Sequence, residues 1–97
     1  MNWDLSAAVQ RLLAFRSARD WQRFHQPKEL AAAIAIEAAE LQELFLWRER
    51  ETADEVTADP QRLEKIREEI ADIAIFLLLA THDLRIDLVS RVRSNET

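Results

Sequence analysis

The chain has 97 residues, a formal net charge of -5, and neither glycine nor cysteine. We expect residues 1–97 to form a single domain, and association with further copies would help so small a core. Without cysteine, disulfides, thiolate catalysis and zinc–thiolate sites are excluded; without glycine, so are the loops that bring the backbone close to phosphate.

The composition predicts an all-α protein, because the chain is rich in Ala, Leu, Glu and Arg, which are strong helix formers. We expect a first helix to run from a cap at Asn2 or Asp4 to about Arg23. Its apolar residues recur at helical spacing, at Leu5, Val9, Leu12 and Phe15.

The rest of the chain predicts two long helices and a short one. A second helix is expected over residues 27–47, with a proline in its first turn. A polar, exposed loop is expected over residues 48–59. Asp59 then caps a third helix over residues 60–84. A helical segment over residues 88–93 completes a small bundle of three main helices plus a short C-terminal helix.

The sequence also indicates the compartment of the protein and which kinds of partner it binds. The longest apolar stretch, residues 73–80, is far shorter than the ~20 residues that a membrane-spanning helix needs. The first residues lack the basic and apolar pattern of a secretory signal. The negative charge argues against general nucleic-acid binding. We therefore expect a cytoplasmic protein that binds neither membranes nor nucleic acids.

Acidic residues interrupt the apolar faces of both long helices. On a helical wheel, Glu37 and Glu40 fall within the apolar stripe of the second helix. That stripe consists of Leu30, Ala33, Leu41 and Leu44. In the third helix, Glu69 borders the core face, and Phe76 lies on the same stripe one turn beyond Asp72.

Two pairs of acids on neighbouring apolar faces require compensation. Carboxylates on adjacent turns repel each other, and their burial costs more unless a positive charge is near. A divalent cation meets this need, and ligation by oxygen alone favours Mg²⁺ or Mn²⁺ over zinc or copper. Plain salt bridges to Arg62, Lys65 or Arg67 remain an alternative.

Three motifs in order along the chain are similar to those of one family. Residues 20–28, DWQRFHQPK, resemble the segment D-W-x-x-F-H-x-P-K/R of the MazG-like dCTP pyrophosphatases. Residues 37–47, EAAELQELFLW, resemble their E-x-x-E-L-x-E-x-F-x-W, and residues 68–73, EEIADI, their E-E-x-x-D-V/I. Residues 86–88, IDL, match a further family signpost. The resemblance covers about residues 15–90.

The resemblance implies an activity and a site. Enzymes of this family bind Mg²⁺ and hydrolyse a nucleoside triphosphate to the monophosphate and pyrophosphate, a reaction that suits removal of unwanted nucleotides. By this resemblance, the catalytic, metal-binding residues are Glu37, Glu40, Glu69 and Asp72. The resemblance also implies substrate contacts from Trp21, His25 and Trp47. Lys28 is a further candidate, as a phosphate contact.

Several mechanistic points stay open at the level of sequence. Carboxylates that hold Mg²⁺ can neutralise a triphosphate and orient a water, without a covalent nucleophile. The proton of that water can pass to an unligated oxygen of a site carboxylate, or to Glu43 or Glu68 just outside the site. Phe76 also neighbours the site, where the family commonly has tyrosine.

The sequence also predicts an assembly, leaves two rival interpretations open and excludes a third. Because residues 73–80 are hydrophobic nearly all round, we expect a homodimer or homotetramer with active sites built from two chains. The main alternative is a non-catalytic helical dimerisation module whose acids form salt bridges. A phosphoribosyl-ATP pyrophosphohydrolase is a sister possibility. A di-iron bundle is excluded, since neither His25 nor His82 follows a glutamate at the required spacing.

Overall fold

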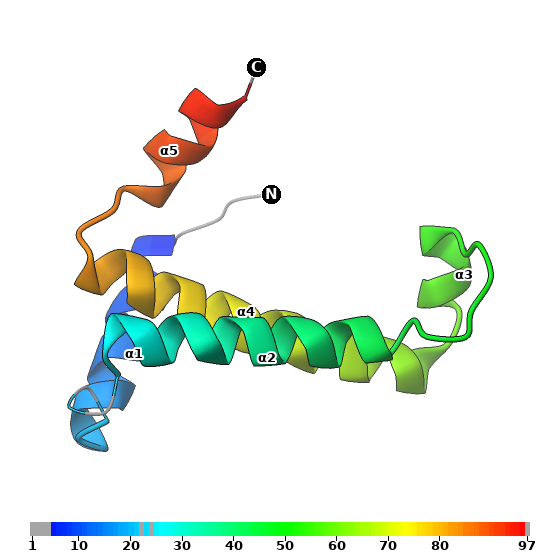
Figure 1. Ribbon diagram of the computed structural model, residues 1–97, viewed down its shortest axis with the longest axis horizontal. Helices are drawn as coiled ribbons and strands as arrows, with labels where there is room; N and C mark the ends of the chain where they lie inside the picture. Colours follow the sequence, from blue (N-terminus) through cyan, green and yellow to red (C-terminus); the bar gives the residue numbers. More distant parts are fainter. Residues whose placement is uncertain (1–4, 22, 24, 97) are drawn as a thin grey trace.

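The computed structural model describes residues 5–21, 23 and 25–96. Its regular elements within this part are α-helices: α1 (Leu5–Ala18), α2 (Pro27–Glu43), α3 (Ala53–Thr57), α4 (Pro60–Asp83) and α5 (Leu88–Asn95). The long helices α2 and α4 lie side by side, and α1 packs near the end of α4 (Figure 1). The short α3 lies at the opposite end, and α5 extends away from the pair. The all-α prediction is confirmed.

Both long helices begin where the sequence predicts. Pro27 and Pro60 each occupy the first turn of their helix, where a missing N–H costs nothing. The side chain of Asp59 accepts a hydrogen bond from the backbone N–H of Arg62 at 3.2 Å. The predicted starts of these helices are therefore confirmed, and their antiparallel pairing sets the acids of α2 beside those of α4 (Figure 1).

The first helix is shorter than expected. It ends at Ala18, whereas the sequence analysis extended it to about Arg23. Asp20 adopts a left-handed conformation with φ 55°, which aspartate tolerates better than most residues. The backbone N–H of Trp21 then donates to the carbonyl oxygen of Arg16 at 3.0 Å. This closing turn ends the helix. The proposed caps at residues 2 and 4 lie outside the described residues.

The segment between the long helices also differs from the prediction. The second helix ends at Glu43 rather than Trp47, and Trp47 has a left-handed backbone with φ 64°. The segment over residues 48–59 was expected to be a loop, but it contains α3. The side chain of Thr52 accepts the backbone N–H of Glu55 at 3.2 Å. This threonine and a glutamate three residues later are a helix-start signal that the prediction missed.

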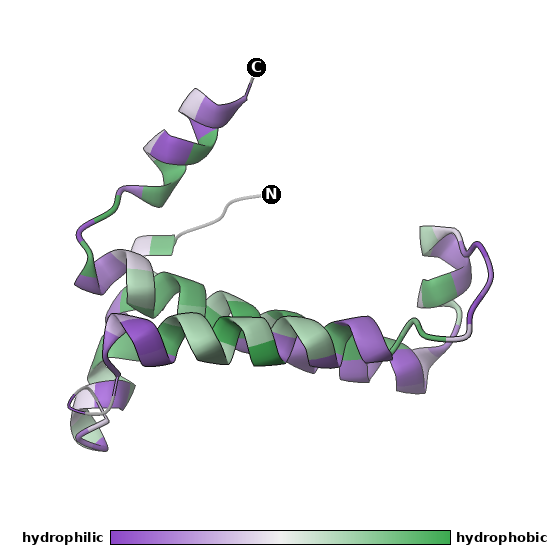
Figure 2. Cartoon of the chain, in the orientation of Figure 1, coloured by the Kyte–Doolittle hydropathy of each residue, from purple (hydrophilic) through white to green (hydrophobic). Residues whose placement is uncertain are grey.

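The core is small and lies between the paired helices. Leu30 on α2 and Ile66 and Leu79 on α4 are buried, with Leu30 only 1% exposed. Green hydrophobic colour covers the middle of the α2–α4 pair, while hydrophilic residues gather at the end that carries α3 (Figure 2). In the described part of the chain, no helix has the length and apolar character needed to cross a membrane.

Candidate metal and nucleotide site

A cluster of carboxylates lies where α2 faces α4. Glu37 and Glu40 stand on adjacent turns of α2, and Glu69 reaches them from α4. One carboxylate oxygen from each of the three lies within 4.8 Å of the others. These acids interrupt the apolar stripes of their helices, and helix pairing brings three of the four predicted ligands into one cluster.

Two of these acids have buried oxygens without a hydrogen-bond partner among the described residues. These oxygens are Oε2 of Glu37 and Oε2 of Glu69. The pKa of Glu37 is raised, first by a hydrogen bond that its protonated carboxyl can share with Glu69, and then by burial. The negative charges of Glu69 and Asp72 raise it further. The cluster is thus repulsive when fully ionised.

The donor set fits a divalent cation. It offers oxygen ligands alone, which suits Mg²⁺ or Mn²⁺, and a cation would satisfy the two buried oxygens that lack a partner. Asp72 lies outside the 4.8 Å group, but its charge acts on Glu37, so it borders the cluster.

Two of the three cations that could have neutralised the cluster are engaged elsewhere, and no ion pair found among the described residues includes Lys65. Arg62 forms an ion pair with Glu51 at 2.8 Å, and its Nε donates to the carbonyl oxygen of Leu44. Arg67 pairs with Glu64, its neighbour on the same helix, at 3.3 Å. Over residues 5–21, 23 and 25–96, the ion pairs found leave out the four candidate ligands. The salt-bridge alternative therefore lacks its expected partners.

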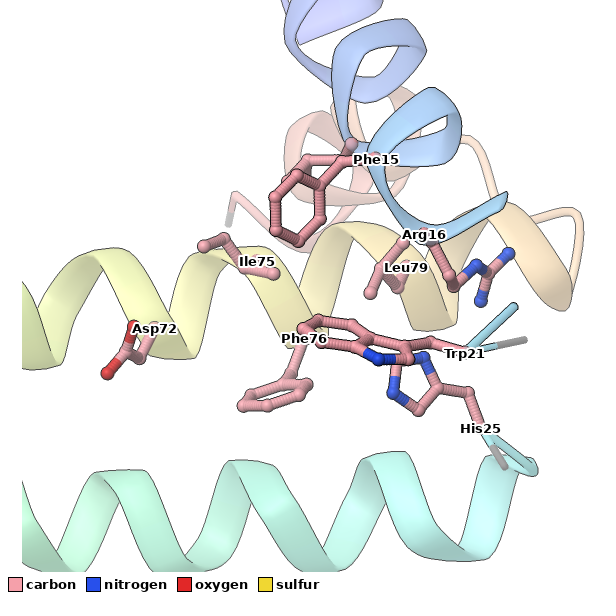
Figure 3. A pocket seen from close by; sticks show the side chains of 9 residues that line it. Phe15, Arg16, Trp21, His25, Asp72, Ile75, Phe76 and Leu79 are labelled. Carbon is pink, nitrogen blue, oxygen red and sulfur yellow. The ribbon is translucent and has the colours of Figure 1, made fainter. Parts of the chain in front are cut away.

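An apolar cavity of about 500 Å³ has Asp72, one of the four candidate ligands, in its wall. Its wall is a chain of aromatic edge contacts: ring centroids of Phe15 and Trp21 are 5.4 Å apart, and those of Trp21 and His25 are 6.2 Å apart. The rings of His25 and Phe76 are 6.5 Å apart. The remaining lining residues are Leu12, Arg16, Asp72, Ile75 and Leu79. Figure 3 shows Trp21, His25 and Phe76 grouped together, with Asp72 apart from them along α4.

The cavity has the character of a site for a flat heterocycle. Its aromatic edges can pack on a ring, and Nδ1 of His25 is buried without a hydrogen-bond partner among the described residues. Asp72 belongs both to the cavity wall and to the surroundings of Glu37. A ligand with an aromatic ring could therefore pack in the cavity, and a divalent cation held by the carboxylates could bind an anionic tail of the same ligand.

The other predicted site residues lie elsewhere in the single chain. Lys28 is exposed in the first turn of α2 and is absent from the cavity wall. Trp47 is 98% exposed beyond the far end of α2, a helix of ~25 Å, so it does not meet Trp21 in one chain. Glu43 and Glu68 are exposed and line a separate cavity, where the end of α2 lies beside the first turns of α4.

One pair of residues escaped the sequence analysis. Arg16 is only 7% exposed, and its guanidinium donates two hydrogen bonds of 2.8 Å to the carboxylate of Asp83 on α4. Arg16 follows Leu12 by four residues, which sets both on one face of α1. That spacing is the signal in the sequence, but a charged residue on an apolar face does not by itself reveal its partner.

Known proteins are similar to this chain over most of its length. The model of the MazG-like family matches residues 32–95. The dCTP pyrophosphatase 1 of Bos taurus is 38% identical over 85 residues, which are 87% of this chain and 50% of the relative. The Homo sapiens protein of that name is 36% identical over 87 residues, 89% of this chain and 51% of the relative. The chain thus spans about half the length of the curated relatives it matches.

A solved structure gives the same result for the fold. It is a pyrophosphatase from Archaeoglobus fulgidus, with a TM-score of 0.82 and 34% sequence identity. The match covers 97% of this chain and 86% of that one. The family model takes in most of the chain, including α4 with Glu69 and Asp72. The chain therefore belongs to the MazG-like family.

Proposed function

We propose that this protein hydrolyses nucleoside or deoxynucleoside triphosphates to the nucleoside monophosphate and pyrophosphate, with Mg²⁺ as cofactor. The observation that carries the proposal is the group of three carboxylates, with two buried oxygens lacking partners, beside an aromatic cavity. The names of the relatives, dCTP pyrophosphatase and pyrophosphatase, support the same reaction. Removal of unwanted nucleotides is the biological task that fits it.

Each part of the substrate has a proposed place. The base packs against Trp21, with His25 and Phe76 on its other edges, in a cavity with a mainly apolar wall. The triphosphate then passes Asp72 toward the other carboxylates, because Asp72 borders both regions. This path brings the α and β phosphates, rather than the terminal one, nearest the cluster.

The chain's carboxylates have the central chemical role. Glu37, Glu40 and Glu69, with Asp72, would hold Mg²⁺, which when bound neutralises phosphate charge and lowers the pKa of a water. The bond that breaks joins the α-phosphorus to its bridging oxygen, and pyrophosphate leaves. The water's proton passes to a free carboxylate oxygen of the cluster or to Glu43 or Glu68. Lys28 supplies a further cation for the phosphates.

We also propose that the active protein is a homodimer or homotetramer. Trp47 is almost completely exposed and has a left-handed backbone, which is unusual for a bulky residue. A role in base binding requires Trp47 to act on the site of a neighbouring copy. The cytoplasm, where nucleotides are abundant, is the compartment that suits this activity.

The experiment is early-time product analysis with a panel of nucleoside triphosphates and Mg²⁺. We expect monophosphate and pyrophosphate in equal amounts, detected by anion-exchange chromatography and ³¹P NMR. Glu69→Ala should abolish the reaction, whereas Glu64→Ala, an exposed acid on the same helix, should keep it. Diphosphate and orthophosphate as first products would overturn the proposed bond cleavage. No hydrolysis and no saturable stabilisation by Mg²⁺ would favour the dimerisation module.

A further inference from the structure

We propose that Arg16 is a positioning residue for the aromatic cavity: its ion pair with Asp83 fixes the end of α1 on α4 and thereby sets where Trp21 lies. The inference rests on the proposed function, because a bound nucleotide is what the position of Trp21 would affect. Four observations on the described residues support it.

The first observation is the geometry of the ion pair. The two terminal nitrogens of Arg16 donate to separate oxygens of Asp83, both at 2.8 Å. The side chains are 9% and 25% exposed. Two parallel hydrogen bonds fix the plane of the guanidinium as well as its distance, which a single contact does not do. The pair therefore fixes how α1 lies on α4.

The second observation is that the backbone of Arg16 holds Trp21. The carbonyl oxygen of Arg16 accepts the N–H of Trp21 at 3.0 Å, in the turn that closes α1. Asp20 makes this turn possible through its left-handed backbone. One residue thus binds α4 through its side chain and Trp21 through its main chain.

The third observation is that Trp21 lies within the aromatic wall of the cavity and contacts two of its other rings. Its ring contacts Phe15 on one edge and His25 on the other. His25 in turn contacts Phe76 on α4. Figure 3 shows Arg16 and Trp21 near Leu79, opposite Phe76. If α1 shifts on α4, Phe15 and Trp21 shift relative to Phe76, which belongs to α4.

The fourth observation is that the pair is poorly explained by helix stability. Asp83 is the last residue of α4, where the negative end of the helix dipole disfavours an acid. A partly buried ion pair also adds little net free energy compared with apolar packing. What the pair supplies is a defined geometry. The guanidinium is also already bound to a carboxylate, which disfavours direct binding of phosphate by Arg16.

The test compares Arg16→Met and Asp83→Asn with the control Arg67→Met, which removes an exposed ion pair within α4. The first readout needs no nucleotide: the indole N–H signals of the tryptophans in ¹H–¹⁵N NMR spectra, with that of Trp21 assigned by Trp21→Phe. We expect both pair variants to move the Trp21 signal and leave that of Trp47 in place. The control should move neither.

The second readout is the kinetics of hydrolysis. Both pair variants should raise KM roughly tenfold, the size of one lost aromatic contact, and leave kcat within about twofold. Arg16→Lys, which keeps the charge without the paired geometry, should restore KM only in part. Asp83→Asn is decisive, because it leaves Arg16 in place: if Arg16 bound phosphate directly, this variant would not raise KM.

The outcomes separate this inference from the proposed function. A Trp21 signal unchanged in both pair variants would overturn the positioning role, whatever the activity. A lowered melting temperature with unchanged KM and unchanged Trp21 signal would mean that the pair serves stability alone, and would also overturn it. Wild-type protein that hydrolyses no nucleotide would refute the proposed function, while the NMR comparison would still decide the role of Arg16.

Discussion

At the scale of single residues, Glu37 lies in surroundings that oppose the charge of its carboxylate. Its carboxylate faces Glu69 and feels the charge of Asp72, and these neighbours together with burial raise its pKa. One of its oxygens is buried without a partner among the described residues. An apolar or amide side chain would suit the metal-free fold better. The residue is therefore best explained by the ligand that it would bind.

Replacing Glu37 should separate stability from metal binding. In the absence of metal, Glu37→Gln should raise the melting temperature, because it removes repulsion from Glu69 and Asp72. With Mg²⁺ at ten times its Kd, the wild type should gain roughly 5–10 °C, and the variant should gain almost nothing. Calorimetry with and without Mg²⁺ checks both effects.

The matched control for this prediction is Glu64→Gln. Glu64 lies on α4 but pairs with Arg67 at the surface, so its loss should leave the response to Mg²⁺ intact. An equal response to Mg²⁺ in wild type and Glu37→Gln would remove Glu37 from the metal site.

At the scale of the elements, the molecule has one strong pairing, that of α2 with α4. Helices α1 and α3 are attached to α4 by less extensive contacts. Helices α2 and α4 lie side by side and enclose the buried residues Leu30 and Ile66. Helix α1 is attached near the end of α4, where Arg16 meets Asp83. The acidic cluster belongs to the strong pairing, whereas the aromatic cavity depends on the attachment of α1.

The attachment of α1 should depend on pH through Asp83. The hydrogen bonds and charge of Arg16, with smaller contributions from His82 and His25, lower the pKa of this carboxyl. A lowered pKa stabilises the fold fully above the ordinary aspartate pKa, and this stabilisation is lost as the pH falls through the lowered value. Near neutral pH, Asp83→Asn should cost about 1–3 kcal/mol of unfolding free energy.

The measurement is urea unfolding of wild type and Asp83→Asn from about pH 7 to about pH 3. The difference between the two proteins should shrink as the pH falls below the ordinary aspartate range. A difference that stays constant over this range would show that ionisation of Asp83 is not what attaches α1.

At the scale of the whole molecule, one copy is too open for its length. Its radius of gyration is 15.6 Å, whereas a compact domain of this length has about 12.5 Å. Its accessible surface is 8012 Å², whereas a compact monomer of this size exposes about 5,700 Å². The excess of accessible surface over that of a compact monomer is larger than the ~800 Å² that one partner buries in a standard interface. A second copy would cover such a surface.

The outer face of α4 is the surface that we expect to be covered. Ile70 and Leu77, seven residues apart and so on one side of the helix, are 52% and 42% exposed. Light scattering after size exclusion should give the mass of a dimer or tetramer. Ile70→Glu should lower that mass, while Gln61→Glu adds the same charge on the opposite side of α4 and should not. A wild-type monomer would refute the proposed assembly.

The local signals of the chain determined the long helices and the candidate ligands. Prolines and the cap at Asp59 set where α2 and α4 begin, because these signals act within one turn. The four acids stood out because they interrupt an apolar stripe, a property of a single helix. The threonine cap of α3 is also a signal within one helical turn. The polar residues around it favoured a loop in the prediction.

The tertiary structure alone decided which of these residues meet. Helix pairing brought Glu69 to Glu37, while it left Trp47 exposed at the far end of α2. The pair of Arg16 and Asp83 joins residues 67 positions apart, and no periodicity of one helix contains that information. The left-handed turn at Asp20 was likewise unmarked by glycine. Local patterns determine helices, whereas a site depends on the distances between them, which only the packing of the whole chain determines.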